Sequence, residues 1–228
     1  MKNLKRRFFI KSSSLVAGGL VLPSFNINRM ANSANNKKLK VSVVGCGGRG
    51  TGAAVQALRA DENVELVAMA DAFKDRLEKS LNAIKQEFEG EKKIEVKEKN
   101  MLVGFNGYKK AIDLADVVIL ATPPGFRPLH FKYAIDQDKH VFMEKPVATD
   151  AHGVRQVLET AKVANQKKLN VVVGLQRRYQ YSYLNILKQV RRGVIGKITS
   201  GQVRWNGAGV WVRGRKPNQT EMEYQMRN

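Results

Sequence analysis

The stretch from Val41 to Gly50 restricts the possible folds of this chain more than any other. A β-branched run, Val-Ser-Val-Val, leads into Gly-x-Gly-x-x-Gly, and a segment of helical character, Thr51–Leu58, follows. In a phosphate-binding turn the three glycines permit a sharp turn, a close approach of backbone to a pyrophosphate, and close packing of helix on strand. The helix then directs its N-terminal N–H groups at the anion. Alone, the pattern is also compatible with a structural turn. The predicted cofactor-binding residues are Gly45, Gly47, Gly48, Arg49 and Gly50.

An acidic residue lies at the distance from this turn that ribose binding requires. The apolar segment Val64–Ala70 is typical of a buried strand and ends at Asp71, about 20 residues beyond Gly50. A carboxylate there can accept both ribose hydroxyls of an adenosine, and it repels a 2′-phosphate. Lys74 and Arg76 are close enough in sequence to soften that repulsion. We therefore predict Asp71 as a cofactor-binding residue and NAD as the cofactor, with NADP the less favoured alternative.

Strand-like and helix-like segments alternate regularly after the turn. Strands are expected at residues 39–44, 64–70, 94–99, 117–121, 139–143 and 171–175. Helices are expected at 50–61, 75–88, 108–114, 131–137 and 150–166, the last beginning at a cap on Thr149 or Asp150. Such alternation favours an α/β fold with a parallel, doubly wound sheet of the Rossmann type. We assign residues 37–176 to this dinucleotide-binding domain.

Polar and proline residues follow the expected strands at the places where ligands of open α/β sheets bind. Thr122 and Pro123 come after the fourth strand, Glu144 and Lys145 after the fifth, and Gln176 after the sixth. Because the strands are parallel, their carboxyl ends share one edge of the sheet. We predict that Thr122, Pro123, Glu144 and Gln176 bind the cofactor.

The spacing of four motifs resembles that of the Gfo/Idh/MocA oxidoreductases, a family that includes glucose–fructose oxidoreductase and inositol dehydrogenase. The motifs are the glycine turn, Ala121-Thr-Pro-Pro124, Glu144-Lys-Pro146 and Gly174-Leu-Gln-Arg-Arg178, and the likeness runs from about Leu39 to Asn206. The resemblance implies a nucleotide-binding Rossmann domain followed by an α+β substrate domain with a large, mostly antiparallel sheet. We also expect the full-length protein to be a homo-oligomer.

The resemblance assigns chemical roles to individual side chains. Lys145 is implied to lie beside the nicotinamide and to hydrogen-bond the reacting hydroxyl, so it is the main catalytic candidate. Glu144 is the second catalytic candidate, as the residue that orients Lys145 or the nicotinamide. Arg178 and Tyr179, together with Lys145, are the predicted substrate contacts. The family usually supplies an Asp or His base from its substrate domain, and we expect that residue beyond Asn228.

Residues 177–228 differ in character from the alternating region. Tyr181–Arg192 has the pattern of a basic amphipathic helix, residues 196–205 that of a long strand, and no clear period follows Asn206. One helix and one strand make only part of a substrate domain. We therefore expect 177–228 to be the beginning of a domain truncated at its C-terminus; a natural single-domain variant is the alternative.

The first 36 residues have the composition of an export signal. Lys5-Arg6-Arg7-Phe8-Phe9-Ile10-Lys11 is a twin-arginine pattern, and a weakly apolar stretch, residues 12–22, follows it. That stretch is shorter than the ~20 residues that span a bilayer. The arrangement predicts export by the Tat machinery, hence a periplasmic or otherwise exported location without stable membrane insertion. A basic tail on a cytosolic enzyme is the alternative.

Charge and cysteine content exclude several classes of function. The net charge is +20, but a large share lies in the N-terminal segment, and the family resemblance accounts for Arg177 and Arg178. We therefore expect no nucleic-acid partner. The single cysteine, Cys46, excludes an intramolecular disulfide and a multi-cysteine zinc site, and the three histidines are far apart in sequence. No metal site is expected.

Three functions are compatible with these features. The first is an NAD(P)-dependent oxidoreductase that acts on a sugar or cyclitol hydroxyl by hydride transfer to nicotinamide. The second is a redox-neutral, NAD-dependent glycoside hydrolase that works by oxidation, elimination, hydration and reduction. The third is a non-catalytic protein that binds a nucleotide or a sugar. The substrate expected for all three is a small carbohydrate.

Overall fold

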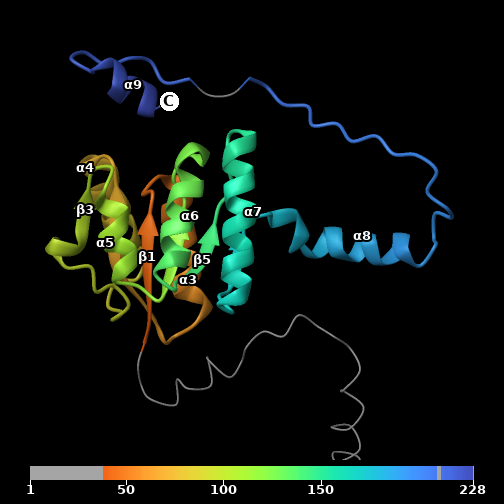
Figure 1. The fold of residues 1–228 in the computed structure, drawn as a ribbon, viewed down its shortest axis with the longest axis horizontal. Helices are drawn as coiled ribbons and strands as arrows, with labels where there is room; N and C mark the ends of the chain where they lie inside the picture. The colour runs from red at the N-terminus through yellow and green to blue at the C-terminus, as the bar shows by residue number, and fades with distance from the viewer. Residues whose placement is uncertain (1–37, 210–211, 228) are drawn as a thin grey trace, which may run out of the picture. The chain divides into compact units, whose positions relative to one another are not determined.

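The computed structural model describes residues 38–209 and 212–227, and the chain divides between Gln176 and Arg177 into two compact units. The first unit is built on a six-stranded sheet in the order β3-β2-β1-β4-β5-β6, in which every neighbouring pair is parallel (Figure 1). The strands are β1 Leu39–Val44, β2 Val64–Asp71, β3 Met101–Val103, β4 Val117–Leu120, β5 His140–Met143 and β6 Val171–Val173. The predicted doubly wound, Rossmann-type α/β class is confirmed.

Helices cover both faces of this sheet (Figure 1). The helices are α3 Gly48–Ala60, α4 Lys74–Glu87, α5 Gly107–Asp113, α6 Arg127–Asp136 and α7 Ala151–Gln166. The pair α3 and α4 packs on one face, and α5, α6 and α7 pack on the other. Short 3-10 turns lie at Glu98–Asn100, Pro124–Phe126 and Gln176–Arg178. As expected, Asp150 caps α7, because its Oδ1 accepts a hydrogen bond of 2.6 Å from the Gly153 N–H.

Each face of the sheet has its own apolar core. Val41 and Val43 of β1 point toward α3 and α4, whereas Val44 points toward the other helices. The same alternation holds in β4, where Ile119 faces one core and Val118 the other. A strand with apolar side chains on both faces belongs in the centre of a parallel sheet, which is where β1 and β4 lie.

The third strand is not where the sequence predicted it. Residues 94–99 form no strand; Ile94 makes only an isolated bridge to Leu66, and β3 begins at Met101. Ile94 and Val96 pack against the apolar core that α3 and α4 cover. Their alternation with charged residues therefore reflects packing on this core and not membership of a strand. The expected strand at 94–99 was therefore wrong, and the ladder with β2 is made by Met101–Val103.

The second unit contains α8 Tyr181–Arg191 and α9 Glu221–Arg227. The helix at 181–192 was expected, but the strand at 196–205 was wrong, because the structure assigns no regular structure there. A strand needs a partner for its backbone groups, and no described residue pairs with this segment. Helix α9 was not predicted, although Thr220 and Glu223 have the spacing of a capping box. In the structure the Glu223 N–H donates a hydrogen bond of 3.2 Å to Thr220 Oγ1.

Two sequence expectations concern membranes and metals. Over the ranges that the structure describes, no helix combines the length and the hydropathy that a bilayer crossing requires. In the same ranges, no group of three or more His, Cys, Asp or Glu side chains is arranged to hold a metal ion. The predicted export signal at 1–36 lies outside the described residues.

Candidate functional site

The predicted cofactor residues of the first unit follow the carboxyl ends of neighbouring parallel strands. The glycine turn follows β1, Asp71 ends β2, Thr122 and Pro123 follow β4, and Glu144 follows β5. Since β2, β1, β4 and β5 are adjacent in the sheet, these groups lie along one edge in that order. This edge contains the point at which the strand order reverses, where open α/β sheets bind ligands.

The glycine turn is packed tightly at two glycines and open at two others. Gly45 has φ +97°, and a Cβ there would lie 2.5 Å from the Thr122 backbone nitrogen. A Cβ on Gly50 would collide with the carbonyl oxygen of Gly45. In contrast, nothing lies within 4 Å of a Cβ on Gly47 or Gly48. The N-terminus of α3 therefore faces open space beside a close-packed turn, and an anion fits there.

Asp71 is held against the glycine turn. Its two carboxylate oxygens accept hydrogen bonds from the Cys46 N–H at 2.7 Å and from the Phe73 N–H at 2.9 Å. Each oxygen retains a lone pair for a further donor. The carboxylate therefore connects the tip of β2 to the turn after β1, in a place where ribose hydroxyls can reach it.

Cys46 has a structural role within this turn. It is buried, and its thiol donates to the Ala70 carbonyl oxygen at 3.4 Å. Burial raises the pKa of the Cys46 thiol far above its usual range, and the neighbouring Asp71 carboxylate raises it further. The thiol therefore stays protonated and is unsuited to nucleophilic or redox chemistry.

Glu144 is nearly buried at the end of β5 and pairs with an arginine of the glycine turn. Its Oε1 accepts a hydrogen bond of 2.6 Å from Arg49 Nε. The Glu144 side chain is 10% exposed and the Arg49 side chain is 47% exposed. Gly174, just after β6, packs against the same carboxylate, since a Cβ there would lie 2.6 Å from Oε1. The predicted residues Arg49 and Glu144 thus meet across the site.

Lys145, the main catalytic candidate, is exposed immediately after Glu144. It precedes Pro146 through a cis peptide bond. Thr122, which is partly buried, and Pro123, which is exposed, stand at the neighbouring strand end. The exposed ammonium of Lys145 is therefore available to a ligand at this edge, beside the buried carboxylate.

Arg127 is a buried residue of this edge that the sequence interpretation missed. Its guanidinium is 1% exposed and donates to the carbonyl oxygens of Thr122, Glu144 and, at 3.4 Å, Pro146. It therefore ties the turn after β4 to the turn after β5. No signal in the sequence indicated this role, because the predicted helix began at Phe131, whereas α6 begins at Arg127.

Burial alters the protonation behaviour around Arg127. Desolvation lowers the pKa of Arg127 to about 10, although the nearby Glu144 carboxylate acts in the opposite direction. Desolvation, reinforced by Arg127, lowers the pKa of His130 to about 4. His130 Nδ1 lies 3.3 Å from Thr122 Oγ1, and its ring lies 4.2 Å from that of Tyr108. At neutral pH Arg127 is therefore a buried cation, and the neighbouring His130 imidazole is neutral.

The predicted residues after β6 are distributed over both units. Gln176 is the last residue of the first unit and is exposed. Arg178 and Tyr179 belong to the second unit, where Tyr179 is 67% exposed. In that unit the guanidinium of Arg177 lies over the rings of Tyr183, at 5.0 Å, and Trp205, at 5.7 Å. The substrate roles of Arg178 and Tyr179 stay predictions.

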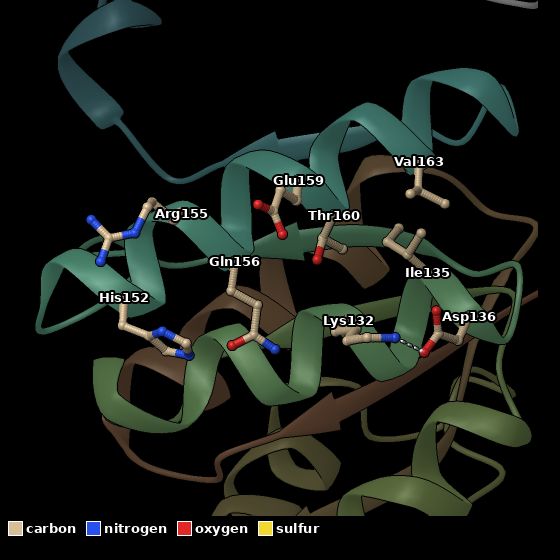
Figure 2. A pocket seen from close by; sticks show the side chains of 9 residues that line it. All are labelled: Lys132, Ile135, Asp136, His152, Arg155, Gln156, Glu159, Thr160 and Val163. Carbon is tan, nitrogen blue, oxygen red and sulfur yellow. Dashed lines mark hydrogen bonds and ion pairs between the residues drawn. The ribbon is translucent and has the colours of Figure 1, made fainter.

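A groove lies between α6 and α7. Figure 2 shows this groove of about 490 Å³, in which Lys132 points toward Asp136 with an ion pair of 2.6 Å. Its lining residues are Lys132, Ile135, Asp136, His152, Arg155, Gln156, Glu159, Thr160 and Val163. None of them is a predicted site residue, so the groove is separate from the cofactor edge.

Curated proteins are similar in sequence to this chain. A glycosyl hydrolase family 109 protein of Solibacter usitatus is 25% identical over 210 residues, 90% of this chain and 47% of the relative. An alpha-N-acetylgalactosaminidase of Shewanella oneidensis is 27% identical over 227 residues, 90% of this chain and 46% of the relative. The chain therefore spans about half the length of these curated relatives.

A solved structure is similar to this chain in fold. The scyllo-inositol dehydrogenase of Lactobacillus casei, with bound NAD(H) and scyllo-inositol, is 25% identical with a TM-score of 0.56, covering 72% of this chain and 44% of that one. The family model for the oxidoreductase family with an NAD-binding Rossmann fold matches residues 39–175. The prediction of NAD as the cofactor is thereby confirmed. With the motifs and the sheet edge described above, this match shows that the chain belongs to the Gfo/Idh/MocA oxidoreductase family.

Proposed function

We propose that this chain is the cofactor-binding part of an NAD-dependent oxidoreductase that acts on a hydroxyl of a sugar or cyclitol. The observation that carries the proposal is the alignment of Asp71, the glycine turn and the Glu144–Lys145 pair along adjacent strand ends. Family membership supports the reaction class, and the inositol bound to the structural relative supports the substrate class.

The described residues have distinct roles in this proposal. The N-terminus of α3, where the space beside Gly47 and Gly48 is open, holds the pyrophosphate, and Asp71 accepts the ribose hydroxyls. When bound, NAD supplies the hydride acceptor. Lys145 hydrogen-bonds the reacting hydroxyl, Glu144 orients that end of the site, and Arg127 holds both turns in place through their carbonyl oxygens. Gln176, Arg178 and Tyr179 contribute further contacts to cofactor or substrate.

The names of the curated relatives favour a second candidate, a redox-neutral glycoside hydrolase. Both are described as glycoside-cleaving proteins, one of them as an alpha-N-acetylgalactosaminidase. In such an enzyme the sugar is oxidised and reduced again within one cycle, so NAD is not consumed. The same cofactor edge serves both reactions, so an activity assay has to distinguish them.

One assay separates these candidates. The full-length protein is incubated with one equivalent of NAD and either an inositol or an aryl α-N-acetylgalactosaminide, without a second electron acceptor. A dehydrogenase yields at most one equivalent of NADH from the inositol and then stops. A glycosidase releases many equivalents of aglycone without net NADH. Binding of NAD without either product would contradict both and leave a non-catalytic binding protein.

We further propose that the protein reaches the periplasm, or is otherwise exported, by the Tat route. The support is the Arg6-Arg7 pair ahead of a short apolar stretch. Replacing both arginines by lysine keeps the charge, so a loss of export would reflect the motif and not the net charge. In a reporter fusion we expect the lysine variant to stay in the cytoplasm. Equal periplasmic recovery of both fusions would refute Tat export.

A further inference from the structure

The ion pair between Arg49 and Glu144 connects the glycine turn after β1 with the end of β5. Arg49 belongs to the glycine turn at the start of α3, and Glu144 follows β5 on the far side of β4. Arg49 Nε and Glu144 Oε1 are 2.6 Å apart. This contact joins residues that are 95 positions apart in sequence. It links the turn where the pyrophosphate is expected to the residue that precedes Lys145.

Glu144 poses an electrostatic problem for a dinucleotide. Its side chain is 10% exposed, and Gly174 packs against the carboxylate, so the charge has little contact with water. A buried carboxylate near the glycine turn repels the anionic pyrophosphate more strongly than an exposed one, because screening by water is weak. Arg127 lies near Glu144 on the α6 side; a cation on the side of the glycine turn would reduce the repulsion toward the cofactor.

Arg49 has the position and the donors for this task. A guanidinium carries five N–H donors. Nε is used by Glu144 and Nη1 contacts Gln56 Oε1 at 3.4 Å, which leaves other donors on a side chain that is 47% exposed. Arg49 also lies in the open part of the turn, next to Gly48. It can bind a phosphate oxygen without releasing Glu144.

We propose that Arg49 is a positioning residue that neutralises Glu144 toward the cofactor and couples phosphate binding to the orientation of the Glu144–Lys145 turn. The proposal rests on the cofactor site described under the proposed function. It assigns to Arg49 an action on Glu144 in addition to a phosphate contact. An isolated surface ion pair would make no such difference, because such pairs contribute little.

An ion pair between α3 and α4 provides the control. Arg59, near the C-terminal end of α3, forms an ion pair with Glu87, and both side chains are largely exposed. R59M and E87Q remove the same chemical groups as R49M and E144Q, but Arg59 lies at the other end of α3 and Glu87 at the C-terminal end of α4. They report the effect of losing such a charge pair without touching the site.

The test is a double-mutant cycle on the 228-residue chain, with R49M, E144Q and the double variant titrated with NAD, ADP-ribose and adenosine. We expect R49M to weaken NAD and ADP-ribose binding by about tenfold, within the range of couplings between linked sites. The double variant should bind both at least about threefold more tightly than R49M, because the unpaired carboxylate is gone. Adenosine lacks phosphates, so its affinity should change less than about twofold. R49K, which keeps the charge, should recover most of the loss, and added salt should reduce it.

Several outcomes would overturn the proposal. R49M could bind NAD as tightly as the parent, which would mean that Arg49 does not contribute to phosphate binding. The double variant could be as weak as R49M, which would mean that the Glu144 carboxylate does not oppose NAD binding when Arg49 is absent. Effects of R49M and E144Q that simply add in the double variant would mean that the two residues act independently. Loss of adenosine binding in R49M, with no recovery in R49K, would indicate a folding defect rather than phosphate coupling. Asp71→Ala separates this failure from that of the cofactor site. If D71A reduces discrimination against NADP while R49M changes nothing, only the role of Arg49 is wrong; if the parent binds no NAD, both proposals fail.

Discussion

At the scale of single residues, the least usual feature is the buried pair of Arg127 and His130 on α6. Arg127 satisfies its charge with backbone carbonyl oxygens, and its Nε has no hydrogen-bond partner among the described residues. His130 is buried beside it and against Tyr108. A second positive charge there would face both desolvation and repulsion, so folding keeps the imidazole neutral.

This arrangement predicts a specific loss of stability in acid. The pKa of His130 falls from 6.5 to about 4 on folding. Above pH 6.5 the imidazole is neutral in both states, and as the pH falls toward 4 only the unfolded chain takes up the proton. The parent should therefore lose roughly 3 kcal/mol relative to His130→Gln between pH 7 and pH 4.

The measurement is urea unfolding followed by far-UV circular dichroism at pH 7, 6, 5 and 4. The quantity of interest is the difference in unfolding free energy between parent and H130Q, because acidic groups common to both then cancel. H152Q, at an exposed histidine of α7, controls for loss of a histidine elsewhere. A difference between parent and H130Q that is constant with pH would show that His130 titrates alike in both states.

At the scale of helices and strands, the sequence predicted what depends on local periodicity. The strands β1, β2 and β4 are rich in apolar residues, and their positions agree with expectation to within a residue. The third strand was misplaced because Ile94 and Val96 pack on the core without joining the ladder. The strand expected at 196–205 was wrong because a strand also depends on partners distant in sequence.

The same limit applied to the candidate site. The glycine turn, Asp71 and Glu144 stand out in the sequence, because spacing and strand ends mark them. The Arg49–Glu144 contact and the burial of Arg127 were not predictable, since both depend on which loops the folded sheet brings together. Gly174 illustrates the point: its lack of a side chain matters only because the Glu144 carboxylate lies against it.

At the scale of the whole chain, the two units differ in how many of their apolar side chains are buried. The first contains both apolar cores, whereas α8 has no buried residue and the described part of 196–209 is exposed. Segments with few buried contacts open at low free-energy cost. We therefore expect trypsin to cut first after Lys197 and Arg204 and later within α8.

Mass spectrometry of the digest tests this expectation. The long-lived product should end between Arg177 and Arg192 at its C-terminal side and should retain NAD binding. Digestion in the presence of NAD serves as a comparison, since a ligand of the first unit should slow the decay of that product but not the early cuts. A product that survives through residue 227 would mean that the second unit is as resistant as the first.

The direction of β1 has a practical consequence. Leu39 begins this central strand, and the glycine turn follows its other end. At about 3.3 Å per residue, six residues separate the two by about 20 Å. A biotin tag or a sensor surface attached ahead of Leu39 would therefore hold the protein by the opposite rim of the sheet, and dissolved nucleotides could reach the strand ends without obstruction.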